Sequence, residues 1–279
     1  MYKIYMLILL IILSLQVRGQ DLFFYGEIGT FQSAASLSIN QAGFIFICDS
    51  GSNEIIKMDT LGNTKRIIGG YGWSASAFDY PADVFANMLN VYVADKNNDR
   101  VQIFDKDLNY LSEISSKKVL NDKLVFRYPL SVSVNSHGDL YILDSDNTRI
   151  LGFSFNGEFK NEIGGYQSGS YTLNNPKDFA VNSTNQLLVL DGQTLVTFDQ
   201  FGNLVNKINL PNNYLAVNYS SNTLLLIGEK NISYLYDSLT PVIRTFSGLP
   251  DGKIIDAALL NKKLYLLTEK KLFVYQIID

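Results

Sequence analysis

Leu140-Tyr141-Ile142-Leu143-Asp144, an apolar run that ends in a polar residue, recurs with small changes along the chain. Six copies align, and the last residues of successive copies are 46, 49, 47, 37 and 40 positions apart. A repeat of this length is typical of the blades of a β-propeller. The copies end at Asp49, Asp95, Asp144, Asp191, Gly228 and Thr268.

Further short strands flank each run. An alternating segment such as Ser131-Val132-Ser133-Val134-Asn135 precedes it, and apolar residues at every second position indicate a strand. A third strand, such as residues 100–104, and a fourth, such as residues 159–163, follow it. The sequence therefore predicts an all-β fold over residues 20–279, a six-bladed propeller with four-stranded blades.

The last copy has only three strands before the chain stops at residue 279. The segment 22–29 resembles the fourth-strand segment 158–164. We therefore expect the N-terminal strand to complete the last blade, which removes an exposed sheet edge.

Residues 1–19 have the pattern of a signal peptide: Lys3, an apolar run over 4–15, and the small residue Gly19 at the cleavage site. The run is too short to cross a bilayer, so we expect no membrane span after signal removal. We expect an exported protein, secreted or periplasmic, and a monomer. Removing these residues would change the net charge from −4 to −6.

The composition excludes several classes of protein. With 47% hydrophobic and 18% charged residues the chain is too apolar to be disordered, and its negative charge argues against nucleic acid as a partner. Cys48 has no partner for a disulfide and sits in an apolar run, so we expect it to be buried. A single Cys and a single His also exclude a Cys/His zinc cluster.

The segments 91–104 and 140–150 resemble the NHL repeat. Tyr80-Pro81, Tyr128-Pro129 and the Gly-Gly pairs at 69–70 and 164–165 also suit that family. The resemblance implies a six-bladed propeller, and the family's amidating lyases hold zinc through several histidines. His137 is the only histidine and lies in a turn, so we expect neither that zinc site nor a catalytic triad.

The polar residues that recur after the apolar runs suit a structural role. An Asp that opens a tight turn accepts backbone N–H bonds, and an Arg on the next strand can pair with it. Because these residues recur in several blades, we assign them to turn structure and predict no catalytic residue. They are Asp49, Asp95, Arg100, Asp144, Arg149 and Asp191.

The residues that open the first strand of each blade are predicted to line one mouth of the central channel. They are Ser36, Asp83, Ser131, Asp178, Tyr214 and Asp256. The three carboxylates could share buried water, or they could bind Ca²⁺ or Mg²⁺. A metal-dependent, lactonase-like hydrolase that uses Asp83, Asp178 and Asp256 is therefore the alternative function.

Loops between blades lead to the same mouth and carry aromatic residues among small ones. Tyr71, Trp73 and Tyr166 are our candidates for ligand contact, because such loops make adaptable binding surfaces. The function expected from the sequence is a binding or interaction module without a cofactor. Its ligand would be a protein, a peptide or a glycan at the channel mouth.

Overall fold

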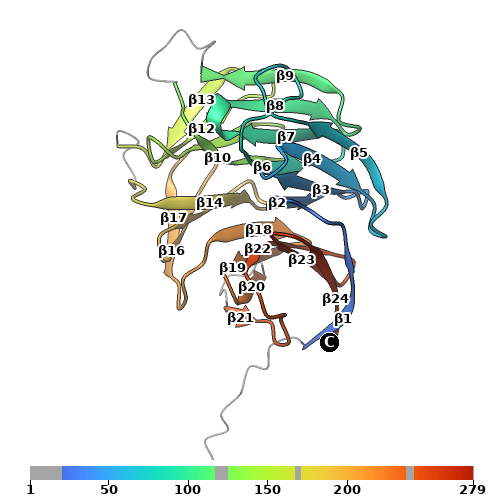
Figure 1. Ribbon diagram of the computed structural model, residues 1–279. Coiled ribbons are helices and arrows are strands. Elements are labelled where there is room, and N and C mark those ends of the chain that lie inside the picture. Colours follow the sequence, from blue (N-terminus) through green and yellow to red (C-terminus); the bar gives the residue numbers. More distant parts are fainter. Residues whose placement is uncertain (1–20, 117–124, 167–170, 237–241, 279) are drawn as a thin grey trace, which may run out of the picture.

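The computed structural model describes residues 21–116, 125–166, 171–236 and 242–278. It contains six four-stranded antiparallel sheets, which confirms the predicted six-bladed propeller. The predicted signal peptide lies outside the described residues. The sheets follow one another around a central axis in chain order, as the blue-to-red colouring of Figure 1 shows.

Blades 1 to 3 take up the first half of the chain. Blade 1 consists of β2 (Ala34–Ile39), β3 (Ile45–Asp49), β4 (Glu54–Met58) and β5 (Thr64–Gly69). Blade 2 consists of β6 (Pro81–Ala86), β7 (Asn90–Asp95), β8 (Arg100–Asp105) and β9 (Tyr110–Ser115), with the short helix η1 (Lys96–Asn98) after β7. Blade 3 consists of β10 (Pro129–Val134), β11 (Leu140–Asp144), β12 (Arg149–Phe153) and β13 (Phe159–Ile163).

Blades 4 to 6 complete the ring. Blade 4 consists of β14 (Pro176–Val181), β15 (Leu187–Asp191), β16 (Thr194–Phe198) and β17 (Leu204–Asn209). Blade 5 consists of β18 (Ala216–Ser220), β19 (Thr223–Ile227), β20 (Ile232–Tyr236) and β21 (Arg244–Thr245). Blade 6 consists of β22 (Ile254–Leu260), β23 (Lys263–Thr268), β24 (Leu272–Ile278) and β1 (Asp21–Ile28).

The N-terminal strand closes the last blade, as the sequence predicts. β1 pairs antiparallel with β24 along its whole length, from Asp21 opposite Ile278 to Ile28 opposite Leu272. A register shift between Phe24 and Gly26 interrupts the pairing. Because the two ends of the chain share one sheet, the ring of blades is held shut by main-chain hydrogen bonds.

The inner strands β2, β6, β10, β14, β18 and β22 form the wall of the central channel. Each contacts the inner strand of the next blade, and β22 contacts β2 (Figure 1). The loops that enter the inner strands lie on one face of the propeller, which we call the entry face. The turns that leave the inner strands lie on the opposite face, which we call the exit face.

The hydrophobic core is divided into six layers, one between each pair of neighbouring blades. The strand β3 illustrates why the second strand of each blade has a continuous apolar sequence. Ile45 and Ile47 pack in the layer shared with blade 6, whereas Phe46 and Cys48 pack in the layer shared with blade 2. Alternate residues point to opposite faces of a sheet, so a sheet buried on both faces needs continuous apolar strands.

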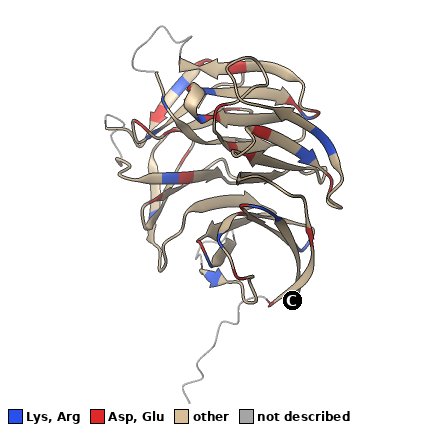
Figure 2. Ribbon diagram, in the orientation of Figure 1, with Lys and Arg blue, Asp and Glu red and all other residues tan. Residues whose placement is uncertain are grey.

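The expected burial of Cys48 is confirmed within the described residues. Cys48 is fully buried, and its Sγ donates to the carbonyl oxygen of Pro81 at 3.0 Å. No helix in the described ranges is long and apolar enough to cross a membrane. Basic and acidic residues are interspersed on the same strands in Figure 2.

The inter-blade layers should dominate stability. Ile142 on β11 is fully buried between blades 2 and 3. We expect Ile142→Ala to lower the free energy of unfolding by about 2–5 kcal/mol, because it leaves a cavity in close-packed surroundings. Phe155→Ala is the control: its side chain is exposed, so the change should stay within about 0.5 kcal/mol. Urea denaturation followed by circular dichroism measures both, and equal losses would contradict the layered core.

Candidate functional site

Equivalent side chains from five blades line the channel at one level. Ser36, Asp83, Ser131, Asp178 and Asp256 each occupy the first paired position after a register shift near the start of the inner strand. Such a shift adds one residue and re-aims the side chain that follows it. Around the channel, the three acids come from blades 2, 4 and 6, and no two of them are in adjacent blades.

Each acid joins its own inner strand to the inner strand of the next blade. Asp178 accepts a hydrogen bond from the N–H of Phe179 at 2.8 Å and another from the N–H of Val217 on β18, also at 2.8 Å. The other two acids form equivalent bridges. Asp83 accepts from Val84 at 2.8 Å and from Val132 at 2.8 Å, and Asp256 from Ala257 at 2.7 Å and Leu37 at 2.9 Å.

Serine hydroxyl groups make the bridges at the three remaining blade interfaces. The Oγ of Ser38 accepts from the N–H of Ala86 at 3.0 Å, and the Oγ of Ser220 accepts from Leu259 at 2.9 Å. Between blades 3 and 4, the Oγ of Ser131 donates to the carbonyl oxygen of Phe179 at 3.5 Å. Side-chain oxygens therefore link every pair of neighbouring inner strands.

Burial raises the pKa values of all three channel acids. The pKa of Asp178 rises to about 7, because burial and then the nearby charge of Asp83 disfavour its ionised form. Burial raises the pKa of Asp256 well above its ordinary value, and the pKa of Asp83 is also raised by burial. A protonated carboxyl group both donates and accepts hydrogen bonds, so these acids need no cation to stay in the channel.

The acids make a poor fit to the predicted divalent metal site. Their oxygens are engaged by backbone N–H groups, and their raised pKa values disfavour the ionised form that binds a metal. Across the described ranges, no group of three or more His, Cys, Asp or Glu side chains is arranged to hold a metal ion.

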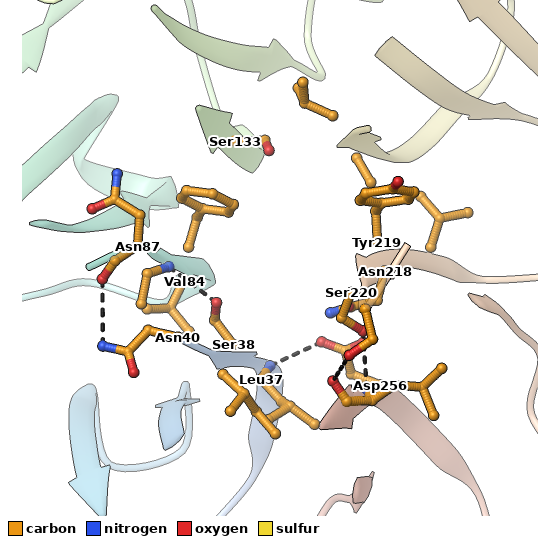
Figure 3. A pocket seen from close by; sticks show the side chains of 18 of the residues that line it. Leu37, Ser38, Asn40, Val84, Asn87, Ser133, Asn218, Tyr219, Ser220 and Asp256 are labelled. Atoms are coloured by element: carbon orange, nitrogen blue, oxygen red, sulfur yellow. Dashed lines mark hydrogen bonds between the residues drawn. The ribbon is translucent and has the colours of Figure 1, made fainter. Parts of the chain in front are cut away.

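The acids mark a waist between two cavities. The narrow cavity opens on the entry face, has a volume of about 230 Å³, and is bordered by Ser36, Lys177, Lys253 and the three acids. The wide cavity opens on the exit face and has a volume of about 450 Å³. Figure 3 shows the wide cavity, with Ser133 on β10, Asn218 and Ser220 on β18, and Asp256 on β22.

The predicted position of Tyr214 at the channel mouth is wrong. Tyr214 precedes β18 and is fully buried between blades 4 and 5, where its hydroxyl donates to Ser233 at 2.8 Å. The equivalent channel position in blade 5 is Ala216, which pairs with Ile227. By analogy with Asn135, which follows the first strand of blade 3, the repeat predicts that Asn218 ends the strand in blade 5, but the strand continues to Ser220. This error moved the whole strand by two residues.

The recurring Asp and Arg residues hold the loops that enter blades 1 to 4. Asp95 accepts from the N–H of Asp79 at 2.8 Å and from the Nε of Arg100 at 2.8 Å. Asp144 pairs in the same way with Arg149 at 2.9 Å. Asp49 and Asp191 accept backbone N–H bonds from Ser33 and Asn175 respectively. The Asp therefore ties the entering loop to the end of the second strand in blades 1 to 4, and an Arg assists in blades 2 and 3.

One entering loop, residues 70–80, is fastened by several buried side chains, and we call it the aromatic loop. The guanidinium group of Arg100 donates to the carbonyl oxygens of Trp73, Ser74 and Ala77 at 2.9–3.1 Å, besides its bonds to Asp95 and Glu113. Asn98 donates to the carbonyl oxygen of Gly72, and Gln102 to that of Ala77. The backbone of the loop is thus held in one conformation.

The aromatic loop presents its rings to solvent. Tyr71 and Trp73 are 66% and 64% exposed, and their rings meet edge to face at 5.7 Å. Tyr166, on the loop before blade 4, is 91% exposed. None of the three borders either cavity, so the structure places them on the entry face beyond the channel mouth.

Two further exposed aromatic residues were not singled out as contact residues from the sequence. Tyr80 and Tyr128 precede prolines and adopt positive φ angles of 55° and 49°. Their N–H groups donate to the side chains of Asn53 and Asp99 on the preceding blades. A bulky residue in this conformation is strained, and such strain occurs at functional sites. The signal available in the sequence was the repeated Tyr-Pro pair.

Comparison with known protein families supports the resemblance to the NHL repeat. Residues 126–153, which span β10 to β12, match the NHL repeat. The chain is a six-bladed propeller that carries an NHL repeat. The resemblance predicted from the sequence is therefore confirmed.

The chain is also similar to one curated protein and to several solved structures. It is 27% identical over 143 residues to Protein brain tumor of Drosophila melanogaster, a match that covers 50% of this chain and 13% of that protein. The streptogramin B lyase structure has a TM-score of 0.65 at 11% identity, covering 91% of this chain and 98% of that one. A catalytically inactive virginiamycin B lyase variant from Staphylococcus aureus, solved with quinupristin, has a TM-score of 0.61 at 10% identity, covering 93% and 99%. The two lyase structures share the fold of this propeller, and at these identities they show the fold alone.

Titration of the channel acids should make stability depend on pH. A raised pKa in the folded chain gives stability that is fully present below the ordinary value of 3.8 and is lost as the pH rises through about 7. Asp178→Asn abolishes this titration. The stability of the variant relative to wild type should therefore increase from about pH 5 to about pH 8.

Thermal melts at each pH measure this difference. Asp59→Asn is the control, because hydrogen bonds from Lys65 and Asn63 lower the pKa of Asp59 and keep it ionised over that range. Its offset from wild type should stay constant. A constant offset for Asp178→Asn as well would show that Asp178 does not titrate in this interval.

Proposed function

We propose that this chain is an exported interaction module that binds a protein or peptide segment at the aromatic loop of its entry face. Export rests on the sequence pattern of residues 1–19. The single observation that carries the binding proposal is a rigid loop that displays exposed rings. Arg100 gives three hydrogen bonds to the carbonyl oxygens of this loop, while Tyr71 and Trp73 stay mostly exposed.

The energetics of interfaces support this reading. Trp, Tyr and Arg dominate the free energy of protein–protein binding, and a preformed loop avoids the entropy cost of ordering on association. The bonds from Asn98, Arg100 and Gln102 fix the loop backbone before any partner arrives. Exposed Tyr80, with Lys96 Nζ 5.4 Å from the centre of its ring, extends the same surface toward the start of β6.

Selection of binders from a library of random peptides tests the proposal. Peptides selected on the immobilised propeller should bind Trp73→Ala about thirtyfold more weakly, because a hot-spot residue contributes about 2 kcal/mol. Phe155→Ala is the matched control, since it removes a similarly exposed ring from the exit face. Peptides that bind both variants equally well would place the interaction elsewhere, and melting curves check that each variant is folded.

The alternative function, a metal-dependent hydrolase, requires a divalent cation at Asp83, Asp178 and Asp256. A cation that binds the folded state would stabilise it and raise the Tm. We expect neither CaCl₂ nor MgCl₂ to raise the Tm beyond an NaCl control of equal ionic strength, because backbone N–H groups already engage the oxygens of the acids. A rise in Tm that depends on the divalent cation and disappears in Asp83→Asn would favour the hydrolase instead.

A further inference from the structure

The wide cavity on the exit face has a lining that suits one class of small molecule. Its volume of about 450 Å³ falls within the range of small-molecule sites. Its lining residues all belong to the described ranges, and the only charged ones are the three acids at the floor. Lys, Arg, Glu and His are absent from that lining, so an anionic ligand would meet no compensating charge.

Two polar side chains in this cavity, Ser133 and Asn218, make no side-chain hydrogen bond to the described residues. Ser133 is 97% buried and, within the described chain, its hydroxyl group makes no hydrogen bond to protein. The amide group of Asn218, on β18, likewise makes none to the described residues. Asn218 is half-buried, and neither polar group is sealed from solvent, so both can bind water or a ligand in the cavity. Figure 3 shows both side chains at the cavity wall.

Hydroxyl groups and aromatic rings complete the lining. Ser38 and Ser220 use their oxygens as acceptors for backbone N–H groups, which leaves each O–H free to donate. Half-buried Phe85 and Tyr219 border the same space. Hydroxyl and amide groups beside aromatic rings match a molecule that carries hydroxyl groups on an apolar ring skeleton.

We propose that the wide cavity binds a neutral polyhydroxylated ligand, namely a saccharide or the end of a glycan, held by Ser133 and Asn218. The acids at the floor oppose an anion, and their backbone hydrogen bonds keep them in place without a cation. This site is separate from the aromatic loop, because the two open on opposite faces of the propeller.

Saturation-transfer NMR with neutral sugars tests the proposal. The probes are glucose, galactose, mannose, xylose and N-acetylglucosamine, with cellobiose, maltose and lactose. Glucuronate supplies a negatively charged counterpart. At least one neutral sugar should receive saturation, and it should bind about tenfold more tightly than glucuronate. If no neutral sugar binds, or if glucuronate binds as well, the proposal fails.

Single substitutions then locate the site. Ser133→Ala and Asn218→Ala should each weaken binding of that sugar about fivefold, because each removes one hydrogen bond. Ser136→Ala is the matched control, since Ser136 is exposed on the turn after β10 and does not border the cavity. Trp73→Ala should also leave sugar binding unchanged, so this test is independent of the peptide test. Unaltered binding in both Ser133→Ala and Asn218→Ala would overturn the assignment.

Discussion

The inner edge of each inner strand has no neighbouring strand, and its N–H groups must be satisfied by other means. A propeller cannot avoid this problem, because six sheets arranged around an axis leave six strand edges facing a channel. Here the preceding blade supplies a side-chain oxygen that accepts such an N–H at five of the six interfaces. Between blades 3 and 4 the hydroxyl group of Ser131 instead donates to a carbonyl oxygen. Asp256 in blade 6 accepts a hydrogen bond from the N–H of Leu37 in blade 1, which completes the ring of bridges. The strand β1, which pairs with β24, also belongs to blade 6.

The same rule, that a buried backbone group needs a partner, also shapes the entry face. The N–H groups of the loops entering the first four blades bond to an Asp at the end of the second strand, which buries a carboxylate. In blades 2 and 3 an Arg pairs with that buried carboxylate. The remaining N–H groups of the guanidinium then need acceptors of their own. In blade 2 those donors fasten the aromatic loop. The proposed binding surface is therefore a by-product of satisfying Asp95.

The sequence predicts most of this fold, because the repeat is a direct consequence of burial on both faces of each sheet. The closing strand and the Asp95–Arg100 pair follow from the same pattern. Tyr214 was misplaced because Asn218, unlike Asn135 in blade 3, does not end its strand, and local alternation cannot show where the strand ends. The wide cavity could not be predicted, since Ser133 and Asn218 come from strands about 85 residues apart in sequence that only tertiary packing brings together. The positive φ of Tyr80 and Tyr128 likewise depends on side chains of the preceding blade.

The alternation of acids with small residues around the channel has a physical explanation. Blades 1 and 3 place a serine at the position that blades 2, 4 and 6 give to an acid, and blade 5 places Ala216 there. A carboxyl group can bridge two strands with two oxygens, whereas a hydroxyl group has only one. Acids in adjacent blades would raise one another's pKa further and weaken the bridges that they make. In a ring of six blades, three is the largest number of acids that can be placed with no two in adjacent blades. This arrangement keeps three carboxyl bridges between inner strands while it limits the repulsion between the acids. The acids of the channel therefore have a structural role, because they bridge neighbouring inner strands. A ligand in the wide cavity would be bound by the uncharged side chains that line it beyond the three acids.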